Sequence, residues 1–140
     1  MKIAKEFNWE MGHRIPDHFG KCKNIHGHSY KMLVEIEGDV LDNGMVMDYY
    51  HLKDAIEPLI EKMDHAFLVN KEDKAVIDFL EKIHSKKVVV DFQSTAENIT
   101  MLFLNEIKKA KLPPNIKKVK VRVYETFDDY AEEEISLNNN

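Results

Sequence analysis

The chain has 140 residues, 44% of them hydrophobic and 32% charged, and its formal net charge is −5. These values predict one globular domain over residues 1–140, while the acidic balance argues against nucleic-acid binding and the single cysteine excludes an internal disulfide. No apolar stretch reaches the length of a membrane span, and the N-terminus lacks the apolar core of a signal peptide. We therefore expect a cytoplasmic protein that does not bind a membrane.

The first two predicted strands share one pattern, in which apolar side chains alternate with polar ones. In residues 2–11 the apolar face consists of Ile3, Phe7, Trp9 and Met11. In residues 29–37 the apolar face consists of Tyr30, Met32, Val34 and Ile36. The first face continues to His13, and the second begins at His26 and His28. In an extended chain these histidines therefore point to the same side as the apolar residues.

Helical periodicity fills the middle of the chain. Asp48 is the predicted N-cap of a helix, whose apolar stripe consists of Leu52, Ala55, Ile56, Leu59, Ile60 and Met63. A shorter helical pattern covers residues 75–83 and precedes an apolar run at 88–90. The sequence S-T-A-E at 94–97 matches a capping box, with Ser94 as the predicted N-cap of a helix that ends before Pro113.

The C-terminal part is predicted to return to strands. Residues 117–125 alternate clearly, with Val119, Val121 and Val123 on the inner face. Residues 129–137 form a predicted closing strand, and the asparagines at 138–140 are expected to fray. The order strand, strand, helices, strand, strand favours an α+β fold, in which helices pack on one face of an antiparallel sheet.

Three histidines form the strongest candidate site. His26 and His28 lie two residues apart, and His13 extends the apolar face of the other strand. A lone histidine on an apolar face is usually a hydrogen-bonded core residue, but three on converging faces are typical of a metal site. Three neutral imidazoles suit Zn²⁺ and leave a fourth position for water or substrate. Fe²⁺ and Ni²⁺ are the alternatives.

Cys22, four residues before His26, has two functional interpretations. Free cysteine is commonly a small buried hydrophobic residue, but nearby cations or a metal favour the reactive thiolate. Cys22 is therefore either a thiolate base beside the metal or a fourth ligand that closes a structural zinc site. The spacing leaves both interpretations open.

Three further positions are candidates for substrate chemistry. Asp64 and His65 follow the first helix, where a histidine either interacts with the helix dipole or acts as an acid–base group beside a carboxylate. Glu125 continues the phase of a buried strand, which is costly for an unpaired carboxylate. It either lies past the buried part of the strand or accepts parallel N–H bonds from a planar, guanidine-like edge. Helix capping is sufficient to explain Thr95, so a ligand role for it is secondary.

Taken in this order, the motifs resemble those of the 6-pyruvoyl-tetrahydropterin synthase/6-carboxy-tetrahydropterin synthase family over nearly the full length. The matching segments are 7–14, 22–30, 48–53, 64–65, 94–98 and 124–126. The resemblance implies the tunnelling fold, in which a four-stranded antiparallel sheet carries two main helices on one face. It also implies a homo-oligomeric barrel, built as a trimer or a dimer of trimers.

The residues that match the family's motifs take three implied roles: metal ligands His13, His26 and His28; catalytic Cys22, Asp64 and His65; pterin-binding Glu125 and Thr95. Cys22 is then the catalytic base, and the metal is Zn²⁺. Asp64 and His65 form a proton-relay pair that joins the site from a neighbouring subunit. Glu125 anchors the amino-pyrimidine edge of the pterin.

The spacing of three residues between Cys22 and His26 resembles the 6-carboxy-tetrahydropterin synthases of queuosine and other 7-deazaguanine pathways. The implied reaction is zinc-dependent conversion of 7,8-dihydroneopterin triphosphate to 6-carboxy-5,6,7,8-tetrahydropterin, with release of acetaldehyde and triphosphate. The alternatives are a pyruvoyl-forming synthase without carbon–carbon cleavage and a zinc- or pterin-binding protein without turnover. The chain departs from the family pattern at Met11 and Gly12, where many members have Ala-Ala, and in its long 71–91 segment.

Overall fold

The structure, a computed structural model, describes residues 1–137, so the predicted fraying of 138–140 lies outside the described residues. The strands are β1 (Lys2–His13), β2 (His26–Gly38), β3 (Ala66–Asn70), β4 (Lys87–Val90), β5 (Ile116–Tyr124) and β6 (Tyr130–Ser136). The helices are the single-turn η1 (Lys21–Lys23), α1 (Tyr49–Met63), α2 (Lys74–Lys82) and α3 (Ala96–Lys109). The strands form one sheet in the order β4-β3-β1-β2-β5-β6.

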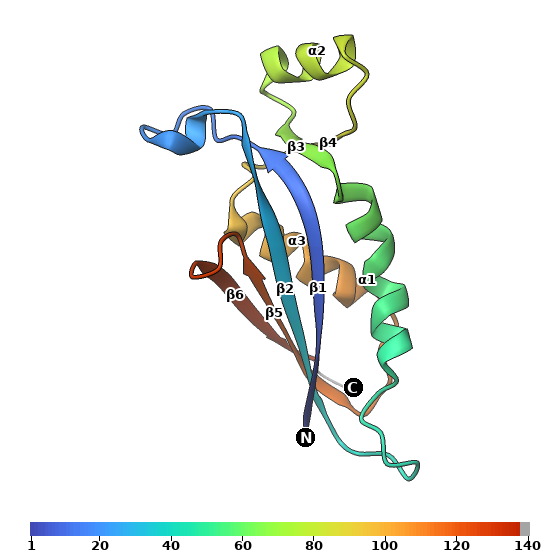
Figure 1. The fold of residues 1–140 in the computed structure, drawn as a ribbon. Coiled ribbons are helices and arrows are strands. Elements are labelled where there is room, and N and C mark those ends of the chain that lie inside the picture. Colours follow the sequence, from blue (N-terminus) through green and yellow to red (C-terminus); the bar gives the residue numbers. More distant parts are fainter. Residues whose placement is uncertain (138–140) are drawn as a thin grey trace.

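The long β1–β2 pair and the β5–β6 pair form the antiparallel part of the sheet. Their alternating sequences place one apolar row on the face that α1 and α3 cover (Figure 1). The buried side chains of this face include Trp9, Tyr30, Met32, Val34, Val121 and Val123. Since burial of such side chains is the main driving force of folding, the alternation predicted from the sequence is confirmed as the core of the fold.

The predicted α+β class is confirmed, but the predicted four-stranded antiparallel sheet is wrong in two respects. The sheet has six strands, and β3 pairs parallel with both β1 and β4. Four of the five residues of β3 are buried, so its sequence is a continuous apolar run in which polar and apolar residues do not alternate. That run follows a helix directly, and nothing in its periodicity distinguishes it from the helix.

The starts of α1 and α3 are set by side-chain caps. Asp48 accepts a hydrogen bond from the backbone N–H of Tyr50 at 2.9 Å, which confirms it as the N-cap of α1. The predicted capping box is wrong by one residue, because Thr95 rather than Ser94 caps α3, accepting from the N–H of Asn98 at 3.2 Å. Ser94 turns toward β1 instead, where its hydroxyl donates to the carbonyl of Arg14.

The end of β1, the start of β2 and the η1 loop lie together at one end of the sheet, close to β3 and β4 (Figure 1). Helix α2 projects beyond the sheet at this same end. Within residues 1–137 no helix is both long enough and apolar enough to span a membrane.

Candidate metal centre and active site

The three predicted histidines meet at the end of the β1–β2 pair. His13 is the register partner of His26, and Met11 is the partner of His28, so the alternation of the strands brings all three imidazoles to one face. Their ring centroids lie 4.6 to 5.1 Å apart. Gly27 makes the close strand approach possible, since a Cβ at this position would lie 2.8 Å from the carbonyl oxygen of Met11.

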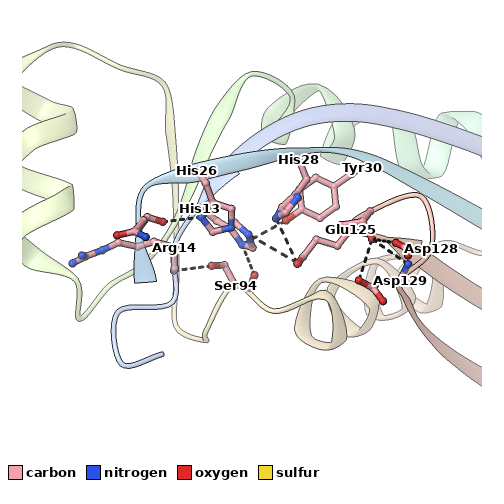
Figure 2. Close-up of polar contacts among 11 residues, drawn as sticks. His13, Arg14, His26, His28, Tyr30, Ser94, Glu125, Asp128 and Asp129 are labelled. Atoms are coloured by element: carbon pink, nitrogen blue, oxygen red, sulfur yellow. Dashed lines mark hydrogen bonds and ion pairs between the residues drawn. The ribbon is translucent and has the colours of Figure 1, made fainter. Parts of the chain in front are cut away.

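Main-chain carbonyls fix the orientation of two of the rings. The Nδ1 atom of His13 donates to the carbonyl of Ser94 at 2.7 Å, and that of His26 donates to the carbonyl of Asn24 at 2.7 Å (Figure 2). Because a carbonyl only accepts, Nδ1 carries the proton and Nε2 keeps its lone pair. Metal-binding histidines are held in this way by acceptors behind the ring.

The environment of the cluster favours neutral imidazoles. Burial lowers the pKa of His13 to about 4, with further lowering by the other two histidines. Burial also lowers the pKa of His28, and His26 adds to the effect. Neutral imidazole is the form that binds a metal ion.

The donor geometry fits a metal ion. One ligand atom from each of His13, His26 and His28 lies within 4.8 Å of the others, and among residues 1–137 no other group of three or more histidine, cysteine or carboxylate side chains has this geometry. The Nε2 atoms of His13 and His28 are buried without a hydrogen-bond partner from the described residues. A buried ring nitrogen without a partner is costly, and a metal ion shared by the three rings would satisfy it.

Glu125 lies directly after the end of β5 and faces the cluster (Figure 2). Its Oε1 atom is 3.5 Å from Nε2 of His28, and its Oε2 atom is 4.0 Å from Nε2 of His13. Burial raises the pKa of this carboxyl group. Together with His28, Glu125 lines a cavity of about 500 Å³. Glu125 thus lies past the strand, as one interpretation of its phase predicts, and its carboxylate faces His13 and His28. That it accepts parallel N–H bonds from a ligand stays a prediction.

The burial of His13 predicts a pH-dependent stability in the metal-free protein. Its folded-state pKa of about 4 lies below the ordinary value of 6.5, so between these two values the unfolded chain binds more protons. The contribution of His13 to stability is therefore complete above pH 6.5 and is lost as the pH falls toward 4, by about 3 kcal/mol. Urea unfolding of the metal-free wild type and of His13→Asn measures this contribution as the difference between their pH profiles. Parallel profiles for the two proteins would contradict it.

Cys22 lies in η1, at the end of the sheet where β1 ends and β2 begins, but it is not part of the ligand group. It is half-buried and carries a free thiol, and its carbonyl accepts from the N–H of Ile15 at 2.8 Å. The geometry thus favours an open three-histidine site over a closed site with four protein ligands. Thr95 lies one residue from the Ser94 carbonyl that holds His13, with its hydroxyl oxygen accepting from the N–H of Asn98.

Asp64 and His65 form a hydrogen-bonded pair at the end of α1. Asp64 Oδ2 is 3.0 Å from Nδ1 of His65, and Asp64 Oδ1 accepts from the backbone N–H of Glu10 at 2.8 Å. The Glu10 N–H and then the His65 ring lower the pKa of Asp64. His65 adopts φ 56°, a left-handed conformation that costs an L-residue about 1 to 2 kcal/mol. The side chains of Asp64 and His65 are thus able to contact each other although the two residues are adjacent in sequence, because His65 adopts this left-handed conformation.

Within residues 1–137 of one chain, the His65 side chain does not join the cluster formed by His13, His26 and His28. His65 lines a hollow of about 450 Å³, and the residues of β1 and β2 that also line it are Glu10, Met11, Gly12, Gly27, His28 and Ser29. Four of these six positions, Glu10, Gly12, Gly27 and Ser29, have the opposite parity to His13, His26 and His28 along β1 and β2. Since neighbouring strand residues point to opposite faces, His65 lies across the sheet from the metal cluster of the same chain.

Two supporting contacts of the site are absent from the sequence predictions. The Ser94 carbonyl holds His13, and no residue pattern signals it because any residue supplies a carbonyl. Arg14, which follows His13, makes a bidentate ion pair with buried Asp73 at 2.7 Å for both bonds. Arg14 holds the pKa of Asp73 below its usual range. The pair joins the 71–91 segment to the metal cluster.

Comparison with known proteins agrees with this geometry. The family described as 6-pyruvoyl tetrahydropterin synthase matches residues 2–135. The 6-carboxy-5,6,7,8-tetrahydropterin synthase of Haemophilus influenzae is 37% identical over 139 residues, which covers 94% of this chain and 96% of the relative. The protein of the same name from Aquifex aeolicus is 36% identical over 155 residues, with the same two coverages.

Two solved structures share the fold. The 6-pyruvoyl tetrahydropterin synthase of Plasmodium vivax superposes with a TM-score of 0.77 at 17% identity, covering 98% of each chain. An uncharacterized protein of Wolinella succinogenes superposes with a TM-score of 0.73 at 25% identity, covering 95% of this chain and 97% of the other. The family match over nearly the whole length and these curated relatives lead to one conclusion: the chain belongs to the 6-pyruvoyl tetrahydropterin synthase family.

Proposed function

We propose that this protein converts 7,8-dihydroneopterin triphosphate to 6-carboxy-5,6,7,8-tetrahydropterin and releases acetaldehyde and triphosphate. The observation that carries the proposal is the group of buried His13 and half-buried His26 and His28, whose ligand atoms lie within 4.8 Å of one another. The names of the relatives from Haemophilus influenzae and Aquifex aeolicus support the carboxy product. The product would serve queuosine and other 7-deazaguanine pathways.

The three histidines are proposed to hold Zn²⁺, which their neutral nitrogen donors and open fourth position suit. When bound, zinc acidifies the side-chain hydroxyls of the substrate and polarises the carbonyl that develops there. The carbonyls of Ser94 and Asn24 keep the rings of His13 and His26 in the metal-binding tautomer. Cys22, outside the ligand group, is the proposed base that removes a proton from the substrate side chain.

Asp64 and His65 are proposed to relay protons at the site of a neighbouring subunit. Their position across the sheet from the histidines of the same chain supports this assignment. The proposed assembly is a trimer or a dimer of trimers in which the sheets form a barrel, each chain being one tunnelling-fold domain. A site shared between subunits places the Cys22 thiol and the His65 imidazole on different chains.

The proposed reaction needs no external oxidant or reductant. Hydrogen is redistributed from the side chain to the dihydropterin ring, which becomes a tetrahydropterin as the side chain is oxidised. Triphosphate leaves by elimination, and cleavage of a carbon–carbon bond releases the terminal two-carbon unit as acetaldehyde. The atoms balance when one water molecule is consumed and the side-chain carbon attached to the pterin ring becomes the carboxylate carbon.

Glu125 is proposed to bind the pterin, with Thr95 lining the same pocket. A carboxylate accepts parallel N–H bonds from the amino-pyrimidine edge, and Glu125 lines a cavity of about 500 Å³ beside His28. We expect Glu125→Gln to raise KM about tenfold or more, because the charge-assisted bonds are lost. Zinc content, measured by atomic absorption, should stay at the wild-type level. An unchanged substrate affinity would show that Glu125 does not bind the pterin.

Anaerobic incubation with 7,8-dihydroneopterin triphosphate tests the proposed function. Acetaldehyde is measured with alcohol dehydrogenase, and the pterins are separated and identified by mass. We expect acetaldehyde and 6-carboxy-5,6,7,8-tetrahydropterin to accumulate in equal amounts. Accumulation of 6-pyruvoyl-tetrahydropterin without acetaldehyde would establish the pyruvoyl-forming alternative, and binding without any product would establish a pterin-binding protein.

A further inference from the structure

Lys86 reaches from the 71–91 segment to the end of α1. Its ammonium group donates to the carbonyl of Glu61 at 2.7 Å and to the carbonyl of Asp64 at 2.7 Å. The last carbonyls of a helix have no partner within the helix and carry its negative dipole end. An ammonium group placed between two of them therefore caps α1 where Asp64 and His65 begin.

The second of these two carbonyls, that of Asp64, belongs to the peptide unit that joins Asp64 to His65. On the other side of this turn, the N–H of His65 donates to the carbonyl of Glu10 at 2.7 Å, and Asp64 Oδ1 accepts from the N–H of Glu10. His65 is held at φ 56° between these contacts. A residue other than glycine stays in the left-handed region of φ and ψ only when the surrounding contacts hold its backbone there.

The main chain of Lys86 is fixed independently of its side chain. Its carbonyl accepts from the N–H of Phe67 at 3.0 Å, which ties it to β3 just beyond His65. Within residues 1–137, Lys86 forms no ion pair with a carboxylate. Lys87, the neighbouring residue, instead approaches Glu81 at 3.7 Å. Of the two adjacent lysines, only Lys86 therefore donates to the carbonyl of Asp64 next to His65.

We propose that Lys86 is a positioning residue for the His65 imidazole, acting through the Asp64–His65 peptide unit; the catalytic part of this inference rests on the proposed function. The 71–91 segment thereby gains a role in the reaction through Lys86. A misplacement of a catalytic group by about 1 Å costs up to about a hundredfold in rate. The loss should therefore fall on kcat and leave substrate binding intact.

Steady-state kinetics of Lys86→Met, Lys86→Arg and Lys87→Met test the proposal. We expect Lys86→Met to lower kcat about tenfold to a hundredfold with KM and zinc content unchanged. Lys86→Arg should restore most of kcat, because the guanidinium also donates to two carbonyls. Lys87→Met, the matched control, should behave as wild type. Equal kcat values for Lys86→Met and Lys87→Met would overturn the proposal.

Hydrogen exchange of the His65 amide separates this inference from the proposed function. We expect exchange to accelerate about tenfold in Lys86→Met and to stay unchanged in Lys87→Met, because of these two lysines only Lys86 donates to the turn. Unchanged exchange in Lys86→Met overturns the positioning role whatever the substrate is. If wild type gives no product while exchange accelerates as expected, the proposed function fails and the positioning role of Lys86 stands.

Discussion

Replacing Cys22 by alanine is expected to lower kcat by about a thousandfold, the middle to upper range for loss of a general base. Zinc content and the free energy of unfolding should stay near the wild-type values, because Cys22 lies outside the group of ligand atoms and its carbonyl contact with Ile15 is a main-chain bond. Rapid-quench kinetics and metal analysis of the same preparation measure both quantities.

The matched control for this variant is Ile25→Ala, which shortens an exposed side chain of the same loop. It should keep both turnover and zinc. If Cys22→Ala loses zinc together with activity, the thiolate is a metal ligand and the site is a closed structural one. If Cys22→Ala keeps wild-type turnover, another group is the base.

The second large effect is expected for His65→Asn, which should lower kcat about a hundredfold or more. Asparagine is chosen because it tolerates φ > 0 better than most residues, and His65 lies at φ 56°. The variant therefore removes the imidazole without adding backbone strain, and its urea midpoint should match that of wild type. A kcat within twofold of wild type would exclude His65 from proton transfer.

Mixing the two inactive variants tests whether the site is shared between chains. In a randomly reassembled equal mixture of Cys22→Ala and His65→Asn subunits, about one quarter of the sites combine an intact Cys22 with an intact His65 from a neighbour. Activity should therefore recover to about one quarter of wild type after unfolding and refolding together. If both residues act within one chain, the mixture recovers no activity.

The metal cluster could be predicted from the sequence because strand parity determines it. His13, His26 and His28 continue the alternation of the apolar residues, and the observed register pairs His13 with His26. Glu125 continues the parity of β5 but lies one residue past its end, and the sequence left open whether it faces the site. The three histidines belong to long, half-buried antiparallel strands, in which the alternation of faces is the clearest local signal.

The parts that could not be predicted depend on the 71–91 segment and on main-chain groups. The short strand β3 is buried throughout most of its length and carries no alternation. The Arg14–Asp73 pair and the contacts of Lys86 exist only once α2 and β4 have folded against the end of the sheet. The shift of the N-cap from Ser94 to Thr95 also has a tertiary cause, because Ser94 is engaged by His13 and Arg14.

Zinc titration of metal-free protein tests the central claim most directly, since that claim is that the three histidines hold the metal required for turnover. Acetaldehyde formation should rise linearly with added zinc and stop rising at about one equivalent per chain. The His28→Ala variant should show no such rise, while His51→Ala, which alters an exposed histidine of α1, should titrate as wild type. Full activity in the metal-free protein, or an unchanged titration of His28→Ala, would contradict the account.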